Sequence, residues 1–301
     1  MTKLLIRLVW SAALATLWTT SARAEPMIPL PSVPSVAEAD GWAIALGAAG
    51  EYEAKYDGSD DYDFEFDPVI AAQWRRGNHV VFLEANELGW RSLQGDRWMI
   101  QTGLRYEEGR DEDDADELEG LGDTDDELMA MGEIRRSFGP SWKNWAAARV
   151  MAGDSDIGAI GILAAGHRLD APFLGDGLDI FAFTTLATAD FINRDFGVTA
   201  SQSASSGLPV TDLDGGFRSV GVSAVARWQP GARWQVTAEA GYERYSDDIA
   251  DSPITRDDYE IEVGVGVTWR FGPGASYRQA SRVARASLTD APSVPVRARA
   301  D

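Results

Sequence analysis

The stretch YEIEVGVGVTWRF, residues 259–271, alternates between bulky apolar side chains and polar or small ones along its whole length. A period of two is typical of a β-strand with one apolar face. Residues 41–52, 97–106 and 233–242 show the same alternation. These stretches exceed the usual length of about five or six residues in soluble sheets, and they are long enough to cross a bilayer at a tilt. The pattern therefore predicts an all-β protein built from long strands.

The segments between the predicted strands alternate between short turns that contain Gly or Pro and long acidic loops. A water-facing sandwich also has strands with one apolar face, but short periplasmic turns and longer extracellular loops are typical of transmembrane barrels. The polar face of the strands is rich in glycine and charge, as a wet lumen requires. We therefore expect a transmembrane, outer-membrane antiparallel β-barrel.

The number of strands follows from the parity of the barrel. A direct count of the alternating stretches gives eleven strands, which would place the two ends on opposite sides of the membrane. Bacterial single-chain barrels have an even number of strands. Dividing residues 79–92 into two short strands at Asn86-Glu87 restores the parity, so about 12 strands are predicted, with both ends of the barrel in the periplasm.

The aromatic residues sort by type between the two ends of the predicted barrel. Tryptophans gather near the short turns and tyrosines near the long loops, as expected for girdles of amphipathic rings at the two membrane interfaces. These rings would contact outer-membrane lipid. The girdle at the short-turn end is predicted to include Trp42, Trp98, Trp228, Trp234, Trp269 and Phe271.

The two ends of the chain differ in composition from the barrel. Residues 1–24 have a basic start, a short apolar run and a small-residue cleavage pattern, which predicts a secretory signal peptide cut after Ala24. Residues 25–40 are Pro-rich and suit an extended periplasmic leader. The barrel then covers residues 41–271, and a basic Ala/Ser/Arg-rich tail of residues 272–301 is expected to be disordered. Together these features predict an integral protein of the outer membrane of a Gram-negative bacterium.

The composition excludes several classes of function. Lys and Arg number 27 against 48 Asp and Glu, a formal net charge of −21, which argues against binding of nucleic acid. The absence of cysteine excludes disulfides, zinc–thiolate sites, iron–sulfur clusters and thiol catalysis. His79 and His167 lie beside predicted turns and in no Ser/His/carboxylate spacing. We therefore expect no enzyme activity, catalytic residue, cofactor or metal ligand.

Negative charge is densest in residues 107–127, which hold thirteen carboxylates and a single cation, Arg110. A run of like charges normally forms a solvated loop, and the topology places this one outside the cell. Binding of a divalent cation is the alternative, because hard cations prefer several carboxylate oxygens. The spacing of the acidic residues does not match an EF-hand.

The polar faces of the strands supply a set of candidate lumen residues. A twelve-stranded barrel lies between the filled eight-stranded and the open sixteen-stranded cases. These side chains therefore either fill a narrow interior as paired charges or line a pore, and carboxylate-rich loops at an open pore would favour cations. The set comprises Gln101, Arg105, Arg233, Gln235, Glu239, Glu260, Glu262 and Arg270.

Several loops at the predicted outer rim carry distinctive segments: YDGSDD at 56–61, GR at 109–110, LEGLGD at 118–123, FGVT at 196–199, SGLP at 206–209 and ADSPI at 250–254. The last predicted strand ends in WRF at 269–271. Taken together, these segments resemble the MipA/OmpV family, the MltA-interacting outer-membrane barrels, and the resemblance covers residues 41–271. The outer-loop clusters either only shape their loops or fold over the pore mouth. The outer-loop residues of interest within them are Tyr56, Gly58, Ser59, Asp60, Gly197, Ser252 and Pro253.

The resemblance implies an outer-membrane location and, for some members, a scaffold that joins a lytic transglycosylase to a peptidoglycan synthase. Other members are similar to small-solute porins or adhesins. We therefore expect a non-enzymatic scaffold or envelope-structure protein with a peptidoglycan hydrolase/synthase complex as its partner, and a porin-like channel for small solutes is the alternative. The tail after Phe271 departs from the usual end of such barrels. Its net charge of +3 suits either a plain extension or docking onto peptidoglycan carboxylates.

Overall fold

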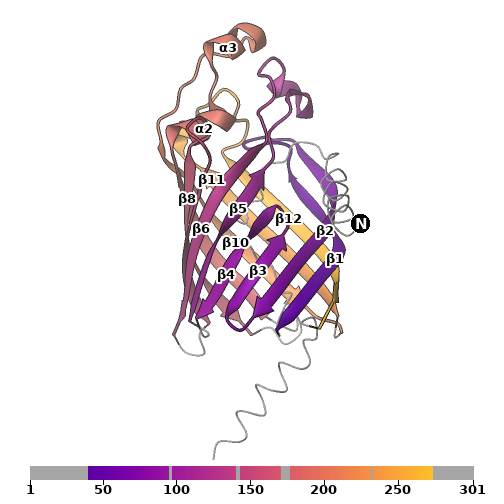
Figure 1. The fold of residues 1–301 in the computed structure, drawn as a ribbon. Helices are drawn as coiled ribbons and strands as arrows, with labels where there is room; N and C mark the ends of the chain where they lie inside the picture. Colours follow the sequence, from indigo (N-terminus) through magenta and orange to yellow (C-terminus); the bar gives the residue numbers. More distant parts are fainter. Residues whose placement is uncertain (1–39, 95–96, 140–142, 171–176, 232, 274–301) are drawn as a thin grey trace, which may run out of the picture.

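The computed structural model describes residues 40–94, 97–139, 143–170, 177–231 and 233–273. Within them the chain forms one closed antiparallel barrel, in which each strand pairs with its neighbours in sequence (Figure 1). The strands are β1 (Gly41–Ala54), β2 (Tyr62–Arg76), β3 (His79–Glu84), β4 (Glu87–Gln94), β5 (Trp98–Glu107), β6 (Glu127–Phe138), β7 (Asn144–Ala152), β8 (Ala159–Leu169), β9 (Gly177–Ala187), β10 (Gly216–Trp228), β11 (Trp234–Tyr245) and β12 (Tyr259–Phe271). The prediction of a twelve-stranded antiparallel barrel is confirmed.

The first and last strands close the ring. The register of β1 with β12 runs from Ile44 opposite Phe271 to Tyr52 opposite Val263, so each of these strands has a partner on both sides. The alternation that predicted β12 is reproduced in space. Val265 faces outward and is 50% exposed, whereas Glu262 faces the interior and is 2% exposed.

The predicted division of residues 79–92 is also confirmed. β3 ends at Glu84 and β4 begins at Glu87, and the two-residue turn between them contains Ala85 at a φ of 47°. A positive φ in such a turn matches the twist of the two strands that it joins. β3 and β4 have only 6 and 8 residues, whereas β2 has 15, so the barrel wall is lower at this hairpin than at β2 (Figure 1).

Apolar side chains cover the outer surface of the barrel, and aromatic rings mark its periplasmic rim. The six predicted girdle residues all lie close to the strand ends at this rim and are exposed or half-buried, as rings that face lipid would be. Trp145 belongs to the same rim but faces inward. It is 4% exposed, and its ring centroid lies 5.3 Å from that of Phe181. The outer face thus carries the lipid-facing residues, and the polar groups turn inward.

Long connections gather at the opposite rim, as the sequence predicted. The connection between β2 and β3 at the periplasmic rim is only residues 77–78, whereas the outer connection between β9 and β10 spans residues 188–215 (Figure 1). None of the helices in the described ranges is long and apolar enough to cross a membrane. The outer connections carry η1 (Glu112–Asp114), η2 (Asp116–Leu118), α2 (Ala189–Phe196), α3 (Ala200–Ser206) and α4 (Asp247–Ala250).

The predicted signal peptide with its cleavage site at Ala24, nearly all of the 25–40 leader and the tail from residue 274 onward lie outside the described residues. These assignments stay predictions.

The outward orientation of Val265, at the middle of β12, can be tested by placing a charge there. We expect Val265→Arg to destabilise the barrel by about 2–4 kcal/mol, because an arginine would face the centre of the bilayer. Leu169→Arg, on the same face but at the periplasmic end of β8, should cost only about 0–1 kcal/mol. Urea unfolding in lipid vesicles measures both values. Equal effects would contradict the assigned depth.

Candidate functional site

Ion pairs cover the inner wall from β4 to β7. Arg149 on β7 donates to Glu87 on β4 at 2.8 Å and to Glu133 on β6 at 3.1 Å. Arg105 on β5 lies 3.6 Å from Glu87 and donates to Glu107 at 2.6 Å. All five side chains are at most 9% exposed. Because a buried charge is costly unless it is paired, each member of this network depends on the others.

The network continues toward β3 through Arg91. This side chain donates to Glu84 at 2.9 Å and to Gln101 at 2.8 Å, and Gln101 in turn donates to Glu133 at 3.1 Å. The guanidinium of Arg91 also lies 4.5 Å from the ring centroid of Phe82. The contacts therefore run without a break from β3 to β7, and they hold these inner side chains in fixed positions.

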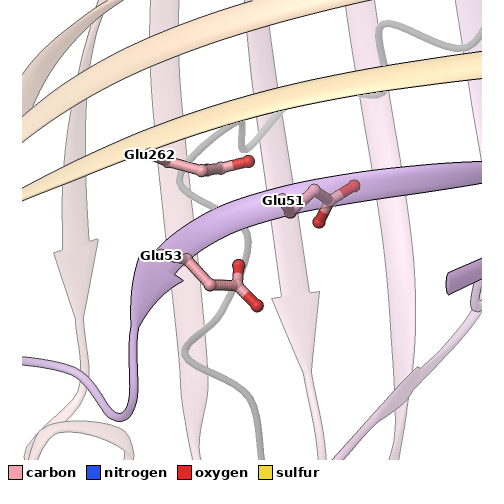
Figure 2. A group of neighbouring side chains, drawn as sticks. All are labelled: Glu51, Glu53 and Glu262. Atoms are coloured by element: carbon pink, nitrogen blue, oxygen red, sulfur yellow. The ribbon is translucent and has the colours of Figure 1, made fainter. Parts of the chain in front are cut away.

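A second part of the inner wall gathers carboxylates. Glu51 and Glu53 on β1 and Glu262 on β12 each place an oxygen within 4.8 Å of the others, and Figure 2 shows the three side chains on these neighbouring strands. A Cβ at Gly264 would lie 3.0 Å from an oxygen of Glu239, so this glycine makes room for a fourth carboxylate. Oxygen donors at such spacing attract hard cations.

The excess of negative charge extends over four adjoining strands. On the inner faces of β1, β2, β11 and β12, nine carboxylates are accompanied by two arginines, Arg75 and Arg270. We call this surface the acidic wall. Its carboxylates belong to Glu51, Glu53, Asp63, Glu65, Asp67, Glu239, Glu243, Glu260 and Glu262.

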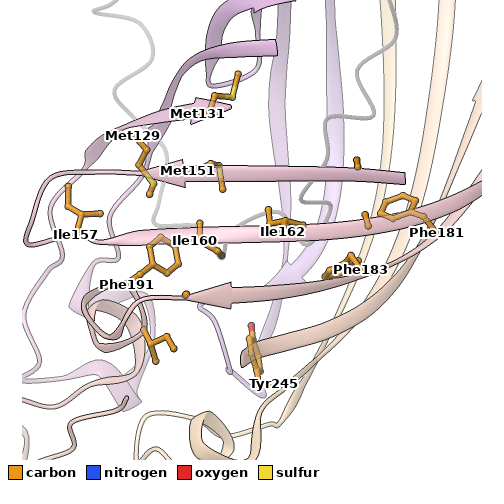
Figure 3. Close-up of a cluster of buried hydrophobic side chains, with 14 of the residues drawn as sticks. Met129, Met131, Met151, Ile157, Ile160, Ile162, Phe181, Phe183, Phe191 and Tyr245 are labelled. Carbon is orange, nitrogen blue, oxygen red and sulfur yellow. The ribbon is translucent and has the colours of Figure 1, made fainter. Parts of the chain in front are cut away.

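A third part of the interior is apolar. The inward side chains of β6 to β9 meet residues from α2 in one buried cluster, which Figure 3 shows in part. Three of its members are methionines, whose flexible side chains adapt to irregular neighbours. The interior thus combines a paired-charge wall, the acidic wall and an apolar wall. The apolar wall includes Met129, Met131, Met151, Ile160, Ile162, Phe181, Phe183 and Phe191.

Four outer connections meet in one packed unit at the outer end of the barrel, which we call the cap. They are the connections that follow β1, β5, β9 and β11. Leu118 is 0% exposed in this unit and Leu121 is 4% exposed. The apolar residues of the cap are Tyr56, Ala115, Leu118, Leu121, Val198 and Ile254, with Leu208 packed against them.

Hydrogen bonds tie the loops of the cap to one another. The Tyr56 hydroxyl donates to the carbonyl of Ile254 at 3.2 Å, and the Ser252 hydroxyl donates to the carbonyl of Phe196 at 2.6 Å. The Gln202 side chain donates to the carbonyl of Leu121 at 2.8 Å. Each bond joins a different pair of connections, so the cap is a single structure rather than four separate loops.

Arg110 lies at the base of the cap and is 7% exposed. It donates to the carbonyl of Asp195 at 2.8 Å, and burial lowers the pKa of its guanidinium. Burial and the nearby charge of Glu117 raise the pKa of Tyr56 to about 12. A cavity of about 30 Å³ opens beside these groups, large enough for water or a small ion. It is lined by Tyr56, Asp57, Glu107, Glu108, Arg110, Arg194 and Asp195.

The structure places seven of the eight predicted lumen residues on the inner face. Glu239 is half-buried there, and the others are nearly buried: Gln101, Arg105, Gln235, Glu260, Glu262 and Arg270. Arg233 requires a correction, because it is exposed in the turn that precedes β11. The predicted strand began at residue 233, but β11 begins at Trp234, so the inward alternation does not reach Arg233.

The predicted outer-loop residues converge on the cap. Asp60 is exposed and Pro253 is half-buried, and the remaining five are buried: Tyr56, Gly58, Ser59, Gly197 and Ser252. Gly58 has a φ of 83°, and its carbonyl accepts hydrogen bonds from the backbone amides of Arg256 and Asp257. The sequence motifs therefore mark residues that hold the loops together.

The acidic segment 107–127 is also part of the cap. One carboxylate oxygen of Glu112 accepts the backbone amides of Gly120 at 3.2 Å and Gly122 at 2.9 Å. Asp126 accepts the amide of Gly109 at 2.9 Å, and this bond lowers the pKa of that carboxyl group. Some carboxylates of this segment thus organise its own backbone.

The lumen residues predicted from the sequence do not include several inner residues of the structure, among them Arg149, Glu133, Glu87 and Arg91. Alternation within residues 127–138 and 144–152 would have placed Glu133 and Arg149 on the inner face. Arg218 is also missing from the predicted set, because it sits at an irregularity in the β9–β10 register. It donates to Glu243 at 3.1 Å and forms an ion pair with Asp57.

Removal of Arg149 tests the paired-charge wall. We expect Arg149→Met to lower the free energy of unfolding by about 3–5 kcal/mol, because Glu87 and Glu133 would lose a buried counter-charge. Lys143→Met, which removes the more exposed pair with Asp170, should change it by about 1 kcal/mol or less. Urea unfolding in vesicles supplies both values. Adding Glu87→Gln and Glu133→Gln to Arg149→Met should restore part of the loss, and no recovery would argue against charge as the cause.

Known proteins are similar to this chain in sequence. The family model described as MltA-interacting protein MipA matches residues 46–271. The putative outer membrane protein YiaT of Escherichia coli O157:H7 is 24% identical over 262 residues, which cover 81% of this chain and 98% of that protein.

Solved barrels are more distant. An outer membrane channel from Pseudomonas putida F1 is 10% identical with a TM-score of 0.40, covering 80% of this chain and 100% of that one. The Ralstonia pickettii toluene transporter TbuX is 9% identical with a TM-score of 0.39, covering 84% and 95%. This outer-membrane barrel therefore belongs to the family described as MltA-interacting protein MipA.

Proposed function

We propose that this outer-membrane barrel is a cation-preferring channel for small solutes and that the cap gates its outer mouth. The acidic wall is the observation that carries the proposal. Its nine carboxylates share four adjoining strands with two arginines, and Arg218 of β10 pairs with one of them, Glu243. Rings and rows of carboxylates in a pore favour cations over anions.

In the periplasmic half of the acidic wall, two strands carry several small inward residues. β1 contributes Ala43, Ala45 and Gly47, and β12 contributes Gly266 and Thr268, next to the longer Arg270. In this proposal the passage runs along β1 and β12, below the carboxylates.

The cap supplies the gate in this proposal. Its apolar contacts join four connections, and loss of one buried leucine weakens such packing by about 2–5 kcal/mol. A cap that is held mainly by these contacts can open as a unit without disturbing the pairing of the strands.

Planar bilayer recordings test the channel and its gate together. We expect stepwise conductance with a reversal potential that indicates preference for K⁺ over Cl⁻ in a KCl gradient. Leu118→Ala should increase the open fraction, because this side chain is fully buried in the cap. Glu51→Gln combined with Glu262→Gln should reduce the preference for K⁺, whereas Glu119→Gln, exposed in the cap, should leave it unchanged. Absence of conductance steps in both the native protein and Leu118→Ala would reject the channel.

A scaffold role is the second candidate, and the description of the family as MltA-interacting favours it. The described periplasmic connection 77–78 offers little surface, so a partner would depend on the leader and the basic tail. Pull-down of the lytic transglycosylase MltA and of peptidoglycan sacculi, with the full chain and with residues 272–301 deleted, tests this. Retention by the full chain alone supports a docking tail. No retention by either form rejects the scaffold.

A further inference from the structure

β3 is shorter than β2, so it does not reach the outer part of this strand. β2 pairs with β1 from Arg75 to Tyr62, which is nearly its whole length. Its pairing with β3 begins at Arg76 and stops where Ala71 lies opposite Glu84. Among the described residues, no strand pairs with residues 62–70 on the side away from β1.

This open edge lies at the depth of the bilayer. Trp74 on the same strand marks the periplasmic interface, and the stacked rings of Tyr52 and Tyr62, with centroids 5.3 Å apart, mark the outer one. An open sheet edge is not found facing hydrocarbon, but it is tolerated where it borders a water-filled space. Pro68, near the middle of the edge, has no N–H group, and proline in a sheet is usual at such edges.

The two faces of this edge have opposite chemistry. The outward side chains of Phe64, Phe66 and Ile70 are 52%, 77% and 47% exposed, so they present rings and an aliphatic group to lipid. The inward positions alternate with them, and all three near the top of β2 are acidic: Asp63, Glu65 and Asp67.

The residues at the remaining borders of the gap also place acidic groups on its inner side. Below it, the hairpin tip turns Glu84 and Glu87 inward. Across it, β5 is tied to the tip, because the amide of Tyr106 donates to the carbonyl of Asn86 at 2.9 Å. Above it lies η1 of the cap. Burial raises the pKa of Asp114 in η1, and the nearby charge of Glu65 adds to this. The gap is thus acidic on the inside and apolar on the outside.

We propose that this gap is a lateral opening, through which amphipathic molecules with a cationic head and an apolar tail pass between the outer leaflet and the lumen. The apolar tail would slide past Phe64 and Phe66 while the head meets the acidic inner face of β2. The route goes beyond the axial channel proposed above and does not require it, because it enters below the cap.

The first test closes the gap. Four residues inserted after Glu84 and four before Glu87, alternating Val and Thr, would extend the hairpin along residues 67–70 of β2, and the even number keeps each existing side chain on its face. The control inserts the same eight residues after Asp156, in the outer connection between β7 and β8.

Hydrogen exchange in lipid nanodiscs measures whether the edge amides of β2 are protected. Pro68 has no amide, and some amides of residues 67–70 point toward β1. We expect the amides of this segment that point away from β1 to exchange rapidly in the native protein and in the control, and to become protected in the extended variant. Protection of these amides already in the native protein would overturn the proposal, because the edge would then be covered by lipid or by another strand.

The second test follows a molecule through the gap. The chain has no cysteine, so Thr237→Cys on the inner face of β11 can carry a single bimane fluorophore. The probe is a nitroxide-labelled dodecyl-trimethylammonium in vesicles, which quenches bimane on approach. We expect quenching in the native protein and in the control insertion, and loss of quenching in the extended variant. Unchanged quenching in the extended variant would overturn the proposal.

Two further probes separate this route from the axial one. A nitroxide-labelled tetramethylammonium, which stays in water, reports entry through the mouth, and its quenching should be equal in the native and extended proteins. Failure of this probe alone, in both the native protein and Leu118→Ala, rejects the axial channel and leaves the lateral opening standing. A nitroxide-labelled fatty acid anion should quench weakly, and quenching equal to that of the cationic amphiphile would overturn the charge assignment.

Discussion

Backbone N–H and C=O groups without a partner cannot face the hydrocarbon of a membrane, and this structure depends on that constraint. Twelve strands meet it by closing into a ring through the pairing of β1 with β12, and the outer part of β2 borders the proposed water-filled gap. Strand pairing uses the backbone alone. The side chains are therefore free to differ widely, provided that those facing lipid are apolar.

The inward side chains use this freedom in three ways. Arg149 pairs with both Glu87 and Glu133, so that wall holds its charges in buried ion pairs. On β1 and β12 the inward carboxylates farther from the periplasm make the wall negative. The apolar wall of β6 to β9 packs against α2, and this contact connects the interior of the barrel with the cap. A barrel that needed only to be stable would have no use for such a division.

Local sequence patterns predicted the strands well because each strand carries its own alternation. β12 has the predicted bounds, and the parity of the strand count predicts the turn at Asn86. Contacts between strands were not predictable in this way. Arg149 and Glu87 are 62 residues apart, and their pairing requires the register of the strands that separate them. Arg233 shows the opposite error, since extending the alternation by one residue placed an exposed turn residue in the lumen.

The sequence predicted that the cap residues lie at the outer rim, but it did not predict the contacts between them. Loop motifs marked Tyr56 and Ser252 as rim residues, yet the bond from Tyr56 to Ile254 spans 198 residues and depends on four loops reaching the same place. No periodic pattern records such a meeting point. Apolar residues within an acidic loop are a better sequence signal of such packing than periodicity. Leu118 and Leu121 lie among the carboxylates of residues 107–127, and both are buried.

The packing of the cap does not depend on the short β3–β4 hairpin. Of the described outer connections, the two-residue turn at Ala85 and Asn86 supplies no side chain to the apolar contacts of the cap. The cap is complete without this hairpin, so β3 and β4 are free to end early without loosening it. Because Glu65 on the open edge lies near Asp114 of η1, any movement of the cap changes the electrostatic field at the gap. Entry from the side and closure at the top are therefore compatible in one barrel, and the same loop, 108–126, borders both.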